Sequence, residues 1–187
     1  MASEGNLEIE VKIAAPDLAA VQSRLVALGF SMITPRTFES NTVWDTAARA
    51  FRQSGEIIRL REFGDRRVLT YKGPAVAGGK HKQREELESE LTSLTAMERV
   101  LARVGLEPAF RYEKYRSEFQ RPGESGVVTL DETPIGHFIE LEGAAGWIDR
   151  TAAALGFPER EYVTKSYATL YVEHCVANGV EPSHMVF

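Results

Sequence analysis

The sequence has a single cysteine, Cys175, among 187 residues, so the chain cannot form an internal disulfide. Scarce cysteine is typical of a reducing compartment, and we expect a cytoplasmic protein. No run approaches the roughly 18 consecutive apolar residues of a membrane span, and residues 1–10 lack the basic and apolar regions of a secretory signal. These absences predict a protein with no membrane partner.

The chain also has no excess of positive charge: its formal net charge is −5, which argues against a nucleic-acid partner. The glycine-rich stretch GPAVAGGK, residues 73–80, is followed by neither Gly-Lys-Ser/Thr nor a helix start, so it is not a phosphate-binding loop of the Walker type. There is no linker or low-complexity tract. Composition and length therefore predict one globular domain over residues 1–187, with either a monomer or a homodimer open.

Helical spacing of apolar residues alternates along the chain with strand-like segments. Helices are expected within residues 16–30, 95–108, 146–159 and 165–177. Strands are expected near 6–13, 31–44, 56–63, 66–72, 81–91, 109–120, 126–132 and 136–143, with a hairpin turn at Gly64-Asp65. This order predicts an α+β fold dominated by an antiparallel sheet.

The segment LEIEVKI, residues 7–13, alternates apolar and charged positions, so that Glu8, Glu10 and Lys12 share one face of a strand. Most other strands repeat the pattern. A solvated sheet face is the ordinary explanation for one such strand. Taken together, however, the polar faces hold mostly Arg, Lys and Glu and little Thr, Ser, Gln or Asn. This composition favours a binding surface with charges of both signs.

An eight-stranded antiparallel sheet can close into a barrel, which would place the first strand beside the last. Glu8 and Glu10 would then share one site with Glu140 and Glu142. Carboxylates crowded in this way repel each other unless a cation relieves them, and oxygen ligands suit Mg²⁺ or Mn²⁺. Arg and Lys on neighbouring strands would bind phosphates. The pattern predicts metal-assisted phosphoryl chemistry.

These residues resemble the CYTH superfamily, also called triphosphate tunnel metalloenzymes, whose signature is similar to Glu8-x-Glu10-x-Lys12. The resemblance continues in order through NTVWDT (41–46), IIRLR (57–61), LTYKG (69–73), KQREELE (82–88), YEKYR (112–116), LDETPIGHFIELEG (130–143) and KSYATLY (165–171). It implies a CYTH-type domain over residues 1–187: a closed eight-stranded antiparallel β-barrel, the triphosphate tunnel, with helices packed outside.

The resemblance also implies roles for individual residues. Those expected to bind the triphosphate are Lys12, Arg59, Arg61, Lys72, Arg84, Lys114, Arg116 and, at the tunnel mouth, Lys165. Those expected to bind metal are Glu8, Glu10, Glu86, Glu88, Asp131, Glu140 and Glu142. Lys12 and Glu10 are the candidate catalytic residues. Lys12 is either a phosphate contact or a general base, and the carboxylates beside it favour the phosphate role.

Within the superfamily, the run from 112 to 143 is most similar to bacterial class IV adenylyl cyclases. This similarity favours conversion of ATP to cyclic AMP and pyrophosphate. A triphosphatase acting on inorganic triphosphate, a nucleoside triphosphate or thiamine triphosphate is the alternative, and a non-catalytic module that binds polyphosphate or nucleotide is a third hypothesis. No motif in the sequence specifies an adenine pocket.

Overall fold

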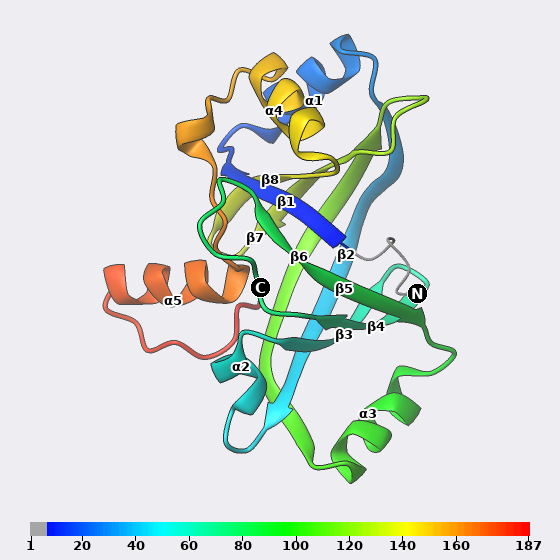
Figure 1. The fold of residues 1–187 in the computed structure, drawn as a ribbon, viewed down its shortest axis with the longest axis vertical. Helices are drawn as coiled ribbons and strands as arrows, with labels where there is room; N and C mark the ends of the chain where they lie inside the picture. Colours follow the sequence, from blue (N-terminus) through cyan, green and yellow to red (C-terminus); the bar gives the residue numbers. More distant parts are fainter. Residues whose placement is uncertain (1–6) are drawn as a thin grey trace.

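Eight antiparallel strands close into a barrel in the order β1-β5-β4-β3-β2-β6-β7-β8 in the computed structural model, which describes residues 7–187 (Figure 1). The strands are β1 (Leu7–Ala14), β2 (Ser31–Thr46), β3 (Ile57–Phe63), β4 (Arg66–Lys72), β5 (Lys82–Glu90), β6 (Leu106–Gln120), β7 (Val127–Thr133) and β8 (Gly136–Glu142). The predicted closed barrel is confirmed, and so is the tight turn between β3 and β4. Residue 6, where the first strand was expected to start, lies outside the described residues.

Across residues 7–187, five α-helices and one short 3₁₀ segment accompany the strands. They are α1 (Leu18–Ala27), α2 (Ala50–Ser54), α3 (Leu94–Arg103), α4 (Ala145–Ala154), η1 (Glu159–Glu161) and α5 (Tyr167–Ala177). The four predicted helices are confirmed. Helix α2 was not expected, because five residues are too short to show a helical period. Asp45 starts this helix by accepting hydrogen bonds from the backbone N–H groups of Phe51 and Arg52, both at 3.0 Å.

The apolar core lies outside the barrel, between its outer face and the helices. Val11 of β1 and Ile139 of β8 are fully buried there against Leu25 of α1 and Ile148 of α4. Figure 1 shows α1 and α4 together at one end of the molecule, with α2 and α3 towards the other. Alternation along each strand therefore leaves the polar residues for the inside of the barrel.

The barrel closes where β1 pairs with β8, and Glu10 lies opposite Glu142 while Lys12 lies opposite Glu140. This register confirms that the first and last strands bring their acidic residues together. Within residues 7–187, no helix has both the length and the apolar character needed to cross a membrane.

Candidate active site

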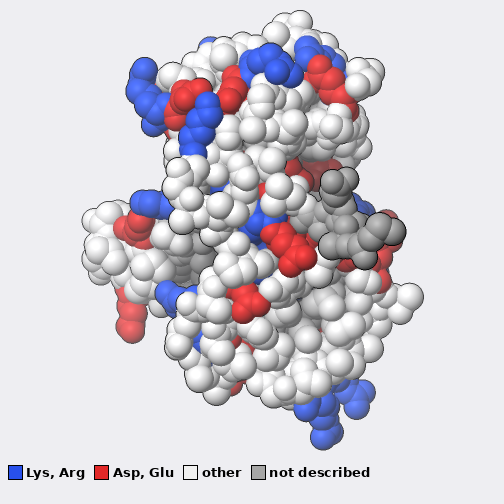
Figure 2. Space-filling model, viewed as in Figure 1, with Lys and Arg blue, Asp and Glu red and all other residues white. Residues whose placement is uncertain are grey.

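A cavity of about 1180 Å³ runs through the barrel and is lined by inward-facing side chains. Figure 2 shows basic side chains in a hollow at the middle of the displayed face, with acidic side chains next to them. All but one of the predicted site residues line the cavity: Glu8, Glu10, Lys12, Arg59, Arg61, Lys72, Arg84, Glu86, Glu88, Lys114, Arg116, Glu140, Glu142 and Lys165. The exception is Asp131, which contacts these residues from the barrel wall.

Lys12 occupies the seam between β1 and β8. Its Nζ lies 2.8 Å from Glu140 Oε1 and 3.3 Å from Glu10 Oε1. Burial disfavours the ammonium ion, but the two carboxylates outweigh burial and raise the pKa of Lys12. Lys12 is therefore held protonated, which suits a phosphate contact better than a general base.

Glu8 anchors a second group of charges on β1, β4 and β5. Lys72 Nζ donates to Glu8 Oε1 at 2.7 Å, and Arg84 Nε donates to Glu8 Oε2 at 2.9 Å. Lys72 Nζ also lies 3.0 Å from Glu86 Oε2. Burial and Glu10 raise the pKa of Glu8, but Lys72 and Arg84 reverse the shift, so its pKa is lowered and the carboxylate stays ionised.

Glu142 has no ion-pair partner among the described residues. Desolvation, followed by repulsion from Glu8 and Glu86, raises its pKa to about 7, although solvent reaches the side chain at the barrel end. The pKa of Glu86 is also raised, by burial and then by Glu8 despite the opposing effect of Lys72. This end of the cavity therefore has more negative charge than its neighbouring cations compensate.

The donor atoms of these carboxylates suit a hard divalent cation, because Mg²⁺ and Mn²⁺ prefer oxygen ligands. No three acidic or histidine side chains in residues 7–187 already converge with the geometry of a metal centre. Glu10 and Glu140 instead pair with Lys12. The assignment of metal ligands thus stays a prediction.

Arg59 and Arg61 of β3 line the cavity as neighbouring cations. Arg59 donates to the hydroxyl groups of Tyr112 at 3.1 Å and Thr70 at 3.2 Å, and Arg61 donates to Glu88 at 2.7 Å. Both Nε atoms are buried and have no hydrogen-bond partner. Burial and the neighbouring charge of Arg59 lower the pKa of Arg61. Glu86 and Glu88 each lie 3.6 Å from the Arg59 guanidinium, so the charges are partly paired. The buried donors that still lack acceptors are suited to an anion.

Asp131 is fully buried and surrounded by donors. It accepts hydrogen bonds from Lys114 at 2.9 Å, from two nitrogens of Arg116 at 2.8 and 2.7 Å, and from the Tyr167 hydroxyl at 2.6 Å. A carboxylate with these four contacts positions cations and a tyrosine. Its predicted metal role would require some of these bonds to be exchanged.

Two buried polar residues of the barrel wall were absent from the predicted set. Glu39 and Asn41 of β2 are fully buried, and Glu39 Oε1 lies 3.5 Å from Lys114 Nζ. Burial raises the pKa of Glu39, but Lys114 and then Arg116 outweigh it and lower the pKa to about 2. The two-residue period could have found both positions, because they share a face of β2.

Lys82 and Tyr167 are two further additions. The alternation places Lys82 on the inward face, although the resemblance does not assign it a role, and its Nζ donates to Glu10 Oε1 at 2.9 Å. Tyr167 enters from α5, and its ring centroid lies 5.1 Å from Lys12 Nζ and 5.0 Å from Lys114 Nζ. The two-residue alternation that identifies inward-facing strand residues does not apply to a helix, so the sequence did not indicate that Tyr167 faces the barrel.

Lys165 lies at the cavity mouth before α5. Its side chain is 51% exposed, and Nζ pairs with Glu173 at 2.7 Å. This position agrees with the expected place at the mouth, and its role in substrate binding stays a prediction.

A barrel whose interior is lined by acidic and basic side chains, with its core on the outside, defines a class of triphosphate-tunnel proteins. The CYTH domain model matches residues 6–167, and the chain belongs to the CYTH family. A protein of Methanocaldococcus jannaschii that is named as a candidate adenylate cyclase is 28% identical over 137 residues, which cover 73% of this chain and 76% of that protein.

Solved structures share the fold. A candidate adenylate cyclase from Vibrio parahaemolyticus superimposes with a TM-score of 0.79 at 22% identity, covering 89% of this chain and 98% of that one. A Pyrococcus horikoshii protein has a TM-score of 0.73 at 25% identity, with 89% and 98% covered. A candidate adenylyl cyclase from Hippeastrum, described as having a dominant triphosphatase activity, has a TM-score of 0.60 at 18% identity, with 95% and 97% covered.

Proposed function

We propose that this protein is a metal-dependent enzyme that converts ATP to cyclic AMP and pyrophosphate, like class IV adenylyl cyclases. One observation carries the general part of the proposal: the cavity holds buried guanidinium donors without acceptors together with carboxylates whose ionised forms are disfavoured. Arg59 and Arg61 have buried donors without acceptors, and Glu142 has a raised pKa beside Glu8 and Glu86. A triphosphate with its divalent cation would supply acceptors to the arginines and positive charge to the carboxylates.

The proposed division of roles follows these contacts. Arg59, Arg61 and Lys12 bind phosphoryl oxygens, while Lys114 and Arg116 are held in place by Asp131. Glu8, Glu86 and Glu142 hold Mg²⁺ or Mn²⁺, with Glu10, Glu88 and Glu140 next to them. When bound, the metal polarises the phosphoryl group and neutralises charge that develops during the reaction.

Hydrolysis of the triphosphate is the second candidate. The triphosphatase activity described for the Hippeastrum relative favours it. The protonated state of Lys12 is also consistent with it, since a water molecule activated by metal needs no lysine as a base. The two reactions would use the same charges and differ in the nucleophile, which is the ribose 3′-hydroxyl in one and water in the other.

Product analysis distinguishes these reactions. The purified protein is incubated with ATP or with tripolyphosphate, each with Mg²⁺ or Mn²⁺, and the products are separated by chromatography. Cyclic AMP and pyrophosphate from ATP support the cyclase. Orthophosphate without cyclic AMP identifies a triphosphatase, and tight binding without turnover under any of these conditions identifies a non-catalytic module.

Two glutamine variants test whether the observed turnover belongs to the cavity. Glu142→Gln is expected to abolish turnover, because it removes a proposed metal ligand. Glu90→Gln is the matched control, because Glu90 lies towards the end of β5 with a side chain that is 73% exposed and pairs with Arg66 on the surface. Equal activity of the two variants would contradict the metal role of Glu142.

A further inference from the structure

The cavity changes character towards α5, where aromatic side chains replace charged ones. Along β6 the inward-facing row runs from Arg116 and Lys114 to Tyr112 and then to Phe110. Tyr171 of α5 faces this end of the row. Phe110 and Tyr171 are only half-buried, so their rings remain accessible from the cavity.

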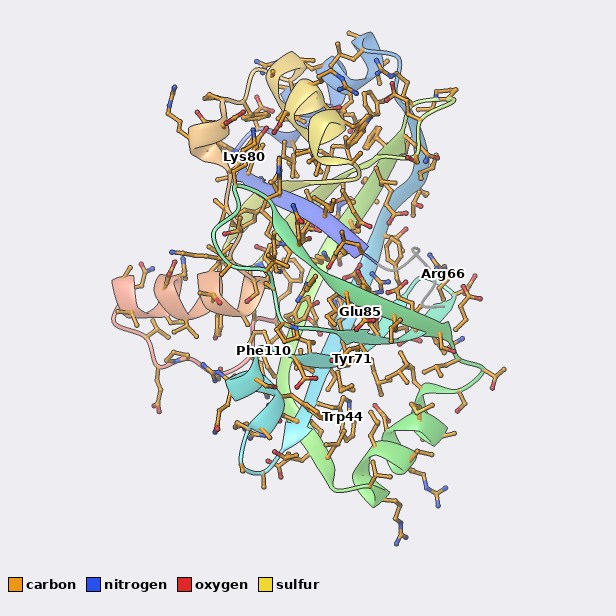
Figure 3. All side chains as sticks on the ribbon, in the orientation of Figure 1. Trp44, Arg66, Tyr71, Lys80, Glu85 and Phe110 are labelled. Atoms are coloured by element: carbon orange, nitrogen blue, oxygen red, sulfur yellow. The ribbon has the colours of Figure 1, made fainter. Side chains whose placement is uncertain are left out.

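The rings form a continuous aromatic wall. The centroids of Phe110 and Tyr112 are 5.9 Å apart with an interplanar angle of 22°, and those of Phe110 and Tyr171 are also 5.9 Å apart, at 38°. Figure 3 labels Phe110 in the region between α2 and α5. The chain end braces the wall, because Met185 exchanges backbone hydrogen bonds with Arg111 at 3.0 Å and Glu113 at 2.8 Å.

The register of the sheet places this wall beside the phosphate-binding arginines. Val43 of β2 pairs with Arg59 on one side and with Phe110 on the other. Adjacent strands are spaced about 4.8 Å apart, so Phe110 lies about 10 Å across the sheet from Arg59.

The size of the cavity also indicates a ligand larger than inorganic triphosphate. Its volume of about 1180 Å³ exceeds the roughly 300–1,000 Å³ of pockets that enclose drug-sized molecules. Tripolyphosphate would use the charged part and leave the aromatic wall without a partner.

We propose that the aromatic wall of Phe110 and Tyr171 binds the nucleobase of a nucleoside triphosphate, whose phosphates extend towards Arg59. This inference rests on the proposed function and assigns residues to the organic part of its substrate. Stacking on an aromatic face tolerates different bases. The wall should therefore make the affinity for nucleoside triphosphates very different from that for tripolyphosphate, while the affinities for different bases should be similar.

Equilibrium titrations of ATP and of tripolyphosphate test the wall, in EDTA so that no turnover occurs. Removal of a stacking ring should raise the Kd for ATP about 10-fold in Phe110→Ala and in Tyr171→Ala. The Kd for tripolyphosphate should change less than twofold. Phe38→Ala is the matched control, because Phe38 is 42% exposed and does not line the cavity, and it should change neither constant.

A conservative variant separates stacking from packing. Phe110→Leu keeps apolar volume against Tyr112 but removes the aromatic face, so it should weaken ATP binding selectively while melting like the wild-type protein. Equal weakening for both ligands, or wild-type affinity for ATP in both alanine variants, overturns the nucleobase site. Wild-type protein that binds neither ligand, in EDTA or with Mg²⁺, overturns the proposed function itself, so the two failures are distinguishable.

Discussion

Glu10 of β1 lies directly opposite Glu142 of β8 across the seam of the barrel, and yet their environments shift the two pKa values in opposite directions. For Glu10, burial raises the pKa, but Lys12 and Lys82 reverse the shift, and the pKa is lowered. For Glu142, burial and the neighbouring Glu8 raise the pKa to about 7. Both residues were expected to bind metal, with Glu10 also a candidate catalytic residue. In the structure, Glu10 is paired with Lys12 and Lys82, whereas Glu142 has no ion-pair partner among the described residues.

The raised pKa of Glu142 predicts a pH-dependent cost to stability. The folded state holds this proton more tightly than the unfolded state, whose ordinary value is 4.5, so stability is lost as pH rises from about 4.5 through about 7. In EDTA, Glu142→Gln should therefore raise the Tm at pH 8 and leave it nearly unchanged at pH 4.5. Thermal melts at both pH values measure this difference.

The control for this experiment is again Glu90→Gln, since Glu90 is exposed on the same sheet. It should give no gain at either pH. A gain for Glu142→Gln that is equal at pH 4.5 and pH 8 would show that the effect does not come from ionisation. Saturating Mg²⁺ should remove the gain at pH 8, because the cation stabilises the wild-type carboxylate.

Arg59 offers a direct test of the phosphate site. Arg59→Ala should raise the Kd for tripolyphosphate about 10- to 100-fold, because a hydrogen bond to a charged group contributes about 1.5–3 kcal/mol. Titration calorimetry measures the change. Arg66→Ala is the matched control: Arg66 has a side chain that is 56% exposed and pairs with Glu90 on the surface. Unchanged affinity in Arg59→Ala would place the anion elsewhere.

The fold could be predicted almost completely from the alternation of apolar and charged residues. In β1 and β8 the apolar positions pack under helices and the charged ones face inward. The alternation within each strand is therefore enough to identify its outer and inner faces. The seam between these strands could be predicted too, because closure of eight strands leaves no other partners for the first and the last. The short helix α2 could not, since its start depends on the side chain of Asp45.

The site could be predicted as a set of residues but not as a set of contacts. The two-residue alternation along a strand identifies which side chains face the barrel interior, but it does not indicate which cation pairs with each carboxylate. Asp131 shows the difference: its place on the inward face of β7 was expected, but its contacts with Arg116 and Tyr167 depend on β6 and α5. Those contacts are made between segments far apart in the sequence.

Asp131 is accordingly predicted to serve stability more than metal. Asp131→Asn should lower the free energy of unfolding by about 3 kcal/mol, because it leaves the buried cations of Lys114 and Arg116 without their shared anion. Chemical denaturation in EDTA measures the loss. Asp65→Asn in the exposed β3–β4 turn is the control, and it should be close to neutral. A variant that is stable in EDTA and defective only with metal would support the metal role.

Variants of Lys12 test whether this residue contacts phosphate or acts as a general base, because the two roles require different protonation states. Glu10 and Glu140 raise its pKa, so we expect a permanent cation that contacts phosphate. Arginine keeps the charge and cannot lose its proton in a protein. Lys12→Arg should then retain tripolyphosphate binding and measurable turnover, whereas Lys12→Gln should weaken binding at least 10-fold. Parallel measurements of Kd and kcat check both variants.

The larger guanidinium group can disturb a buried site even where charge is conserved. Lys72→Arg controls for this effect, because Lys72 is another buried ammonium held between two carboxylates, at 2.7 Å from Glu8 and 3.0 Å from Glu86. The two arginine variants should lose similar, modest amounts of activity. Abolished turnover in Lys12→Arg, with binding intact and Lys72→Arg still active, would instead identify Lys12 as the general base.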